Sequence, residues 1–224
     1  MKSSVEFKEN LNTISGISIE TNFYRFLKIE YLKNPLSGLG SFKYGGRYNF
    51  KTEFEVLYLT SDPDTAVAEG SRDRLLIPPS ALITIKVRLY KIINFEDKKI
   101  IDSLGIREPD LHCPWRKIQD IDEKKAYTQV LGGLIHDSGE FEAIRYPSVE
   151  RIGKYNLAVF TDRLNDNSEI KVYDPDNMIC RTIKGSDLKI EKLNKIYSDK
   201  PTVEEKKLQR SMKDYHKRMI KDKW

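Results

Sequence analysis

The feature that most constrains the fold of this chain is an alternating run at residues 81–95, ALITIKVRLYKIINF. Within it, large aliphatic residues alternate with threonine, lysine, arginine or tyrosine. The aliphatic positions are Ile83, Ile85, Val87 and Leu89. This two-residue period predicts a β-strand that buries one face and exposes the other. It is the clearest strand signal in the 224-residue chain.

Shorter apolar or alternating runs predict further strands, with helices between them. The expected strands cover residues 22–32, 55–61, 141–148, 154–162 and 168–174, and the expected helices cover 61–76, 96–106 and about 120–136. Strands outnumber helices, and neighbours such as 154–162 and 168–174 favour antiparallel pairing. We therefore expect an α+β fold of two packed, mainly antiparallel β-sheets with flanking helices.

The segment 61–76 carries strong helix-start signals directly after a predicted strand. Ser61 or Asp62 can cap the helix, and Pro63 suits its first turn. Asp64 complements the positive end of the helix dipole. The IPPS sequence that follows ends the helix.

The length of the chain suits one domain with appendages. We expect an N-terminal arm at 1–20, a main domain at 21–180 and a C-terminal extension at 181–224. The end of the extension, 203–224, is predicted as an amphipathic helix. Its apolar face comprises Leu208, Met212, Tyr215, Met219 and Ile220. We expect this helix to dock on the domain or on another chain, as in a homo-oligomer; a nucleic-acid or membrane surface is the alternative.

The net charge of +5 is concentrated in this predicted helix. Residues 203–224 hold eight basic and four acidic side chains, so the rest of the chain is close to neutral. The overall charge is therefore poor support for nucleic-acid binding, and we do not expect direct binding to nucleic acid.

The sequence also bears on where the protein resides and on whether it binds a metal. No run of about 18 apolar residues is present, which predicts no membrane span. The N-terminal sequence MKSSVEFKENLNTISG lacks the apolar stretch of a secretory signal. The two cysteines, Cys113 and Cys180, have no second cysteine or histidine at metal-ligand spacing. We expect a reduced, cytoplasmic protein without a bound metal.

Familiar catalytic motifs are absent, including GxxxxGK[ST], HExxH and GxSxG. The three histidines, His112, His136 and His216, share no triad-like spacing with a carboxylate or a nucleophile. A histidine-based acid–base enzyme is therefore disfavoured. What remains is arginine and carboxylate chemistry.

Three positions are candidates for that chemistry. Gly45 and Gly46 allow a sharp turn or a close ligand approach, and the guanidinium of Arg47 after them suits a phosphate. Glu69 falls on the flank of the buried face of its predicted helix, about 100° from the centre and at the edge of a groove. Ser148 follows a strand that a proline ends. On spacing alone, an ordinary loop arginine, an exposed glutamate and a turn serine are the favoured alternatives.

Taken in order, these segments resemble the RES domain family, which is named for an arginine, a glutamate and a serine. The resemblance covers about residues 22–162. The matching pieces are Gly45-Gly46-Arg47-Tyr48-Asn49, Val56-Leu57-Tyr58-Leu59-Thr60, Ala66-Val67-Ala68-Glu69, Tyr146-Pro147-Ser148 and Asn156-Leu157-Ala158-Val159-Phe160, with Arg25 upstream. The family usually has tryptophan where this chain has Tyr48, which keeps an aromatic plane.

The resemblance implies a fold related to the ADP-ribosyltransferases, with NAD as the substrate. It implies a bacterial toxin that degrades NAD by hydrolysis or phosphorolysis. Phosphate is a co-substrate in the phosphorolytic form. The implied partner is an antitoxin that carries an Xre-like DNA-binding region.

The residue types agree with this chemistry. Cleavage of the nicotinamide–ribose bond passes through an oxocarbenium-like centre, as glycoside cleavage does. The cationic nicotinamide leaves as a neutral molecule, so no general acid is needed. A carboxylate can hold a ribose hydroxyl and favour the developing positive charge, an effect often worth about 3–4 kcal/mol. The expected site is Glu69, Arg47 and Ser148 for catalysis, and Arg25, Gly46, Arg47, Tyr48 and Tyr58 for NAD binding.

Two alternatives stay open. The same site can transfer ADP-ribose to a protein side chain, which some family members do. The chain can also be a non-catalytic binding module whose basic tail, 203–224, is the working part. In that case removing the tail would abolish a salt-sensitive affinity for nucleic acid.

Overall fold

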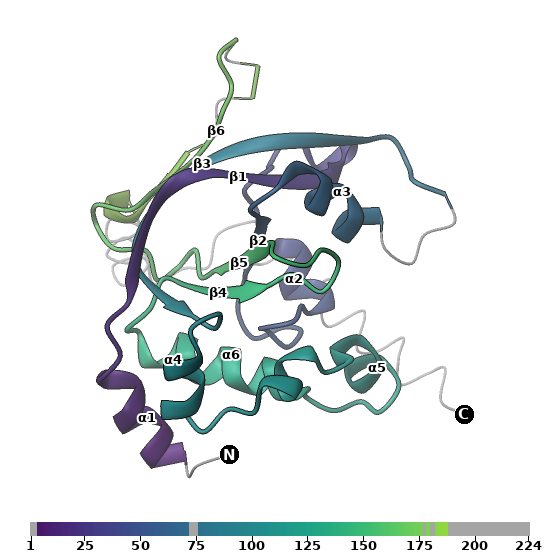
Figure 1. Ribbon diagram of the computed structural model, residues 1–224. Helices are drawn as coiled ribbons and strands as arrows, with labels where there is room; N and C mark the ends of the chain where they lie inside the picture. The colour runs from purple at the N-terminus through teal and green to yellow at the C-terminus, as the bar shows by residue number, and fades with distance from the viewer. Residues whose placement is uncertain (1–3, 72–75, 177, 180–181, 188–224) are drawn as a thin grey trace, which may run out of the picture. The chain divides into compact units, whose positions relative to one another are not determined.

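The computed structural model describes residues 4–71, 76–176, 178–179 and 182–187 (Figure 1). The chain divides into two compact units, Met1–Asp187 and Leu188–Trp224. All described residues belong to the first unit. The helix predicted at 203–224 lies outside them.

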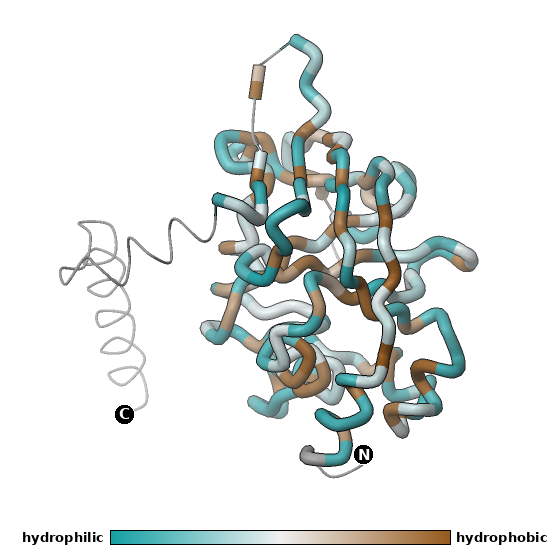
Figure 2. Tube along the Cα trace, turned by 90° about the vertical axis from the view of Figure 1, so that its left-hand side faces the viewer, coloured by the Kyte–Doolittle hydropathy of each residue, from teal (hydrophilic) through white to brown (hydrophobic). Residues whose placement is uncertain are grey.

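The chain builds a seven-stranded sheet with the order β1-β2-β5-β4-β3-β6-β7. The strands are β1 (Ile17–Lys28), β2 (Leu57–Thr60), β3 (Ser80–Asn94), β4 (Ala143–Pro147), β5 (Tyr155–Val159), β6 (Glu169–Val172) and β7 (Thr182–Lys184). The alternating run forms β3, and the four aliphatic positions predicted to be buried are buried. Along the extended segments in Figure 2, hydrophobic and hydrophilic residues follow one another.

The mixed α+β class is confirmed, but the expectation of two packed sheets is wrong. β1 pairs antiparallel with β3, from Ile17 opposite Ile92 to Lys28 opposite Ser80, and it also pairs with β2. This pairing closes β1, β2, β5, β4 and β3 into a five-stranded barrel. β1 and β3 are 12 and 15 residues long, so each can serve different neighbours along its length. Alternation reports one buried face and cannot distinguish a barrel wall from a sandwich layer.

The predicted pairing of 154–162 with 168–174 is also wrong. β5 lies between β2 and β4, so both of its hydrogen-bonding edges are occupied. β6 instead pairs with β3 and β7, beyond the barrel. All the strand pairings are antiparallel except that of β3 with β4.

Helices precede β1 and connect several strands of the barrel. They are α1 (Ser4–Asn12), α2 (Leu39–Tyr44), α3 (Pro63–Ser71), α4 (Lys98–Ser103), α5 (Trp115–Asp120) and α6 (Tyr127–Ser138), with short 3-10 helices at Ile29–Tyr31 and Glu108–His112. The helix expected at about 120–136 begins later, as α6 at Tyr127, and a separate short helix, α5, ends at Asp120. Glu123 between them has a φ of 52°, a left-handed conformation that interrupts an α-helix. None of the described helices is long and apolar enough to cross a membrane.

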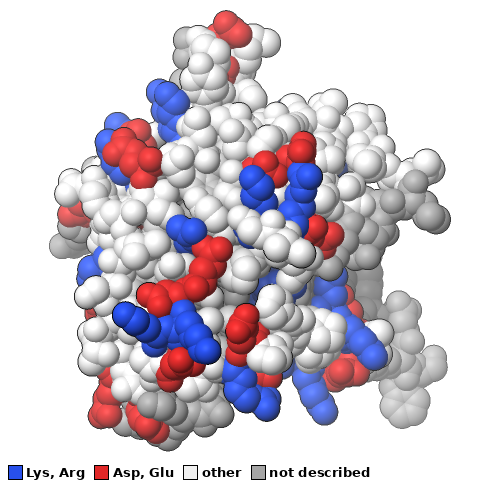
Figure 3. All heavy atoms as spheres, viewed as in Figure 1, with Lys and Arg blue, Asp and Glu red and all other residues white. Residues whose placement is uncertain are grey.

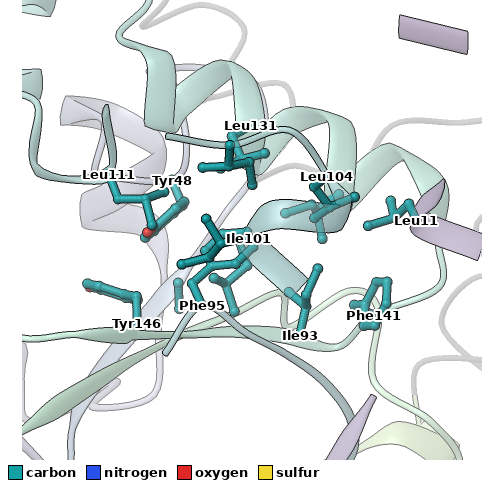
Figure 4. Close-up of a cluster of buried hydrophobic side chains, with 14 of the residues drawn as sticks. Leu11, Tyr48, Ile93, Phe95, Ile101, Leu104, Leu111, Leu131, Phe141 and Tyr146 are labelled. Carbon is teal, nitrogen blue, oxygen red and sulfur yellow. The ribbon is translucent and has the colours of Figure 1, made fainter. Parts of the chain in front are cut away.

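The main hydrophobic cluster lies between the barrel and helices α1, α4 and α6 (Figure 4). It includes Phe7, Leu11, Tyr48, Ile93, Phe95, Leu104, Leu131, Ile135, Ile144, Tyr146 and Phe160. The N-terminal helix joins it through Phe7 and Leu11, both fully buried. Each such burial stabilises the fold by about 1.5–3 kcal/mol.

The start of α3 confirms one of the two predicted caps. Asp62 Oδ2 accepts hydrogen bonds from the backbone nitrogen of Thr65 at 3.0 Å and from its hydroxyl at 2.8 Å. Ser61 instead accepts a hydrogen bond from the backbone of Tyr155 on β5. Because Thr65 and Ala66 are buried, these contacts fix the helix to the barrel.

Candidate active site

A cavity of about 410 Å³ opens at one side of the barrel. Its wall draws on β1, β2, β4, β5, α3, α5 and the loop after α2. Figure 1 shows α3 and α5 on opposite sides of the short strands β2, β4 and β5. The cavity is large enough for a small molecule, since such sites measure roughly 300–1,000 Å³. Five predicted site residues lie in its wall: Arg25, Gly46, Arg47, Tyr58 and Glu69.

Glu69 is the one acidic side chain among the described residues of the wall. Its Oε1 accepts hydrogen bonds from Asn156 Nδ2 at 2.9 Å and from Ser148 Oγ at 3.3 Å. No described residue donates a hydrogen bond to its Oε2. Among the described residues, donors thus hold one oxygen of this carboxylate and none holds the other.

Ser148 reaches the site through Glu69. It is buried, and its hydroxyl also accepts hydrogen bonds from the backbone nitrogens of Glu150 and Arg151. It is not among the residues of the cavity wall. Ser148 therefore contacts the cavity only through the oxygen of Glu69 to which it donates.

Arg47 lies in the turn after α2, and its side chain is bound to the segment that precedes α5. Its Nη1 donates a hydrogen bond to the carbonyl of Leu111 at 2.9 Å, just before α5. The two glycines before it make room for protein side chains, which differs from the expectation of room for a ligand. A Cβ on Gly45 would lie 2.0 Å from Gln119, and a Cβ on Gly46 would lie 2.5 Å from the Tyr58 ring.

The side chain of Tyr48 lies in the core and not in the cavity wall, where the sequence predicted it. Its ring is fully buried and packs edge-on against Tyr146, with centroids 4.8 Å apart (Figure 4). Arg47 and Tyr48 occupy the centre of a turn closed by a hydrogen bond from Gly46 to Asn49. One side chain enters the cavity and the other enters the core. The expectation that the Tyr48 ring lines an NAD site is therefore wrong.

Tyr58 lies in the cavity wall and also locks this turn. Its hydroxyl donates to Asn49 Oδ1 at 2.9 Å and accepts from the backbone nitrogen of Tyr48 at 2.8 Å. Asn49 is buried, and its amide donates to the carbonyls of Ser41 and Phe54. Burial raises the pKa of the Tyr58 phenol, which keeps this hydroxyl protonated.

Arg25 lies in the wall and is also committed to the fold. Its Nη1 donates hydrogen bonds to the carbonyls of Pro35 at 2.6 Å and Ser37 at 3.0 Å. Burial lowers the pKa of this guanidinium to about 10, so it still carries its charge at neutral pH. Arg25 thus adds positive potential to the cavity while it holds the 35–37 loop.

Among the wall residues that the sequence did not mark as site residues, three have side chains suited to ligand binding: Asn156, Trp115 and Arg116. Asn156 is 4% exposed, and strand pairing places it opposite Thr60 and Tyr146. Its Oδ1 is buried without a hydrogen-bond partner among the described residues. Only the pairing of β5 with two distant strands brings it to Glu69. The other two lie on α5, before the point where a helix was predicted to begin.

The charge of the wall favours an anionic ligand. Three guanidinium groups, from Arg25, Arg47 and Arg116, face one carboxylate. The outer surface differs, because acidic and basic side chains are interspersed over the face shown in Figure 3. Among the described residues, no group of three or more His, Cys, Asp or Glu side chains could hold a metal ion.

Fold and cavity together define a class: a small α+β barrel domain whose cavity is lined by three arginines and one carboxylate. The sequence model of the RES domain matches residues 22–180. The chain therefore belongs to the RES domain family.

Comparison with solved structures agrees on the fold. The chain is similar to the MbcT toxin in the crystal structure of the M. tuberculosis MbcT–MbcA toxin–antitoxin complex. The identity is 13%, the TM-score is 0.52, and the match covers 83% of this chain and 96% of that chain. No curated protein matches the chain in sequence.

Proposed function

We propose that this protein is an NAD-degrading toxin that cleaves the nicotinamide–ribose bond by hydrolysis or phosphorolysis. One observation carries the proposal above the others. Glu69 lines a cavity that three arginines also line, and Asn156 and Ser148 hold one of its two carboxylate oxygens. Membership of the RES domain family supports NAD as the substrate.

The proposed step needs only these groups. Glu69 accepts a hydrogen bond from a ribose hydroxyl and stabilises the positive charge that grows on the sugar as the C–N bond breaks. The electron pair of that bond leaves with nicotinamide, which becomes neutral. Water then adds to the sugar carbon and releases a proton, giving ADP-ribose. In phosphorolysis, phosphate adds instead and gives ADP-ribose 1-phosphate.

The surrounding residues supply binding and orientation. The guanidinium of Arg47 keeps its Nε and Nη2 groups without a hydrogen-bond partner among the described residues, so they can donate to a phosphate oxygen. Arg25 contributes charge from a fixed position. No histidine lines the described cavity wall, which suits a reaction whose leaving group needs no proton.

Nicotinamide release from the purified protein is the deciding experiment. The protein is incubated with NAD, with and without inorganic phosphate, and products are separated by liquid chromatography and identified by mass. ADP-ribose indicates hydrolysis, and ADP-ribose 1-phosphate indicates phosphorolysis. Label from adenine-labelled NAD that stays on a protein band would instead establish transfer to a protein. No nicotinamide under any of these conditions, despite NAD binding, would disprove NAD cleavage.

We also propose that an antitoxin with an Xre-like DNA-binding region neutralises this activity, since uncontrolled loss of NAD harms the cell that makes the toxin. Expression of the wild-type chain alone should arrest bacterial growth and deplete cellular NAD. Expression of a Glu69→Ala variant at the same level should do neither. Equal toxicity of the two would separate growth arrest from the proposed site.

A further inference from the structure

The two wall residues on α5 carry an inference about how the substrate is recognised. Trp115 is half-buried, and the guanidinium carbon of Arg116 lies 4.6 Å from the centroid of its ring. Arg116 is exposed and has no hydrogen bond or ion pair with any described residue. An aromatic plane and a charged group thus lie side by side in the wall, in contact with each other, and neither side chain makes a hydrogen bond to a described residue.

The other two arginines of the wall differ in this respect. Arg25 uses Nη1 to hold the carbonyls of Pro35 and Ser37. Arg47 uses Nη1 to hold the carbonyl of Leu111. A guanidinium has five N–H donors in a fixed fork, and Arg116 keeps all of them for a ligand.

The position of α5 relative to Arg47 is fixed from two ends. Gln119 Nε2 donates a hydrogen bond to the carbonyl of Tyr44 at 2.9 Å, and Gln119 Oε1 accepts one from Gln129 at 2.8 Å. At the other end, Arg47 binds the carbonyl of Leu111. A ligand that reaches from Arg47 to Arg116 would therefore meet two arginines whose backbone positions relative to each other are already fixed, which lowers the entropic cost of binding.

We propose that Trp115 and Arg116 form the subsite for the diphosphate and the adjoining adenosine of a dinucleotide. Arg116 pairs with the diphosphate oxygens, and Trp115 packs its ring against the sugar or the base. The ligand class rests on the proposed function. The charge balance agrees with it, because three arginines against one glutamate leave two positive charges for the two negative charges of a diphosphate.

Binding can be measured without turnover. The chain has two tryptophans, so a Trp224→Phe background makes Trp115 the sole tryptophan. ADP-ribose carries the diphosphate and both sugars, and its titration should change Trp115 fluorescence in a saturable way. Arg116→Ala in this background should raise the Kd for ADP-ribose about 10- to 100-fold. The Kd of Arg116→Lys should lie between those of wild type and Arg116→Ala. Adenosine, which lacks phosphate, should bind equally to all variants.

Lys117→Ala is the matched control, because Lys117 is an exposed cation on the same helix outside the cavity wall. It should keep the Kd for ADP-ribose within about twofold. Circular dichroism verifies that each variant is folded. The proposal is overturned if wild type shows no saturable ADP-ribose binding, if Trp115 fluorescence stays constant, or if Arg116→Ala binds as tightly as Lys117→Ala. Normal ADP-ribose binding without nicotinamide release would instead reject the proposed function and leave this subsite standing.

Discussion

Two glutamates, Glu142 and Glu69, show how differently this fold treats the same side chain. Glu142 is 1% exposed and accepts four hydrogen bonds. Oε1 accepts from the backbone of Asn165 and the hydroxyl of Ser168, and Oε2 accepts from the backbones of Tyr90 and Lys91. Glu69 accepts two hydrogen bonds, both on Oε1.

The difference separates a structural carboxylate from an available one. Glu142 joins β3 to the 165–168 segment and saturates both oxygens with protein donors. A buried charge is tolerated when it is satisfied in this way. At Glu69, which lines the cavity, the described residues supply donors for one oxygen only. An unfilled acceptor site on a fixed carboxylate is what a substrate hydroxyl requires.

The largest expected effect is on the rate of the Glu69 variants. Glu69→Ala and Glu69→Gln should lower kcat for nicotinamide release about 100- to 1,000-fold, which corresponds to about 3–4 kcal/mol. The affinity for NAD should change little, because the arginines of the wall supply binding. The free energy of unfolding of Glu69→Ala should fall by about 1–3 kcal/mol, because the buried amide of Asn156 loses its acceptor. Steady-state kinetics and urea unfolding test both statements. A kcat within about threefold of wild type would remove Glu69 from its catalytic role.

Glu142→Gln should show the reverse pattern. The new amide group meets backbone N–H donors instead of a charged acceptor, so the free energy of unfolding should fall by about 2–4 kcal/mol. The activity per folded molecule should remain that of wild type. Urea unfolding at equal protein concentration measures the loss. If Glu142→Gln kept full stability but lost turnover, the assignment of a structural role to Glu142 and a catalytic role to Glu69 would be wrong.

The two residues that donate hydrogen bonds to Glu69, Asn156 and Ser148, should differ in their effect on kcat. Asn156→Ala removes the shorter contact, and kcat should fall about tenfold; Ser148→Ala removes the longer one, and kcat should fall less. Asn156→Asp places a like charge beside Glu69, so the acid limb of the pH–rate profile should move to higher pH. That profile distinguishes positioning of the carboxylate from a general loss of structure. A larger effect of Ser148→Ala than of Asn156→Ala would reverse the ranking.

Local patterns allowed part of this fold to be predicted. β3 and the cap at Asp62 depend on neighbouring residues, and both were found from the sequence. The closure of the barrel depends on the pairing of β1 with β3, across more than 50 residues, and on β5 entering between β2 and β4. Alternation states that a strand has a buried face but does not name the partner of that strand.

The candidate site also shows that local sequence patterns predict only part of the arrangement. Glu69 and Arg47, which line the cavity, each follow a recognisable local device, a capped helix and a glycine turn. The order of the matching segments along the chain, and not either device alone, singled them out. Tyr48 was misplaced because a turn can direct adjacent side chains to opposite sides, and the core offered its ring a buried place beside Tyr146. Asn156 was missed because only strand pairing brings it to Glu69.

The smallest expected effect concerns the helix that presents Glu69. Asp62→Ala removes the cap of α3, and the free energy of unfolding at pH 7 should fall by about 1 kcal/mol. The Thr65 hydroxyl, with Lys154 and Arg151 nearby, holds the pKa of the Asp62 carboxyl below its ordinary value. A depressed pKa stabilises the fold above the unfolded value of about 3.9, and this contribution is lost as the pH falls through the folded pKa. The difference between wild type and Asp62→Ala should therefore shrink below about pH 4. Asp62→Asn is the control, since asparagine caps a helix equally well and does not titrate; a pH-dependent difference between Asp62→Asn and Asp62→Ala would assign the effect to another group.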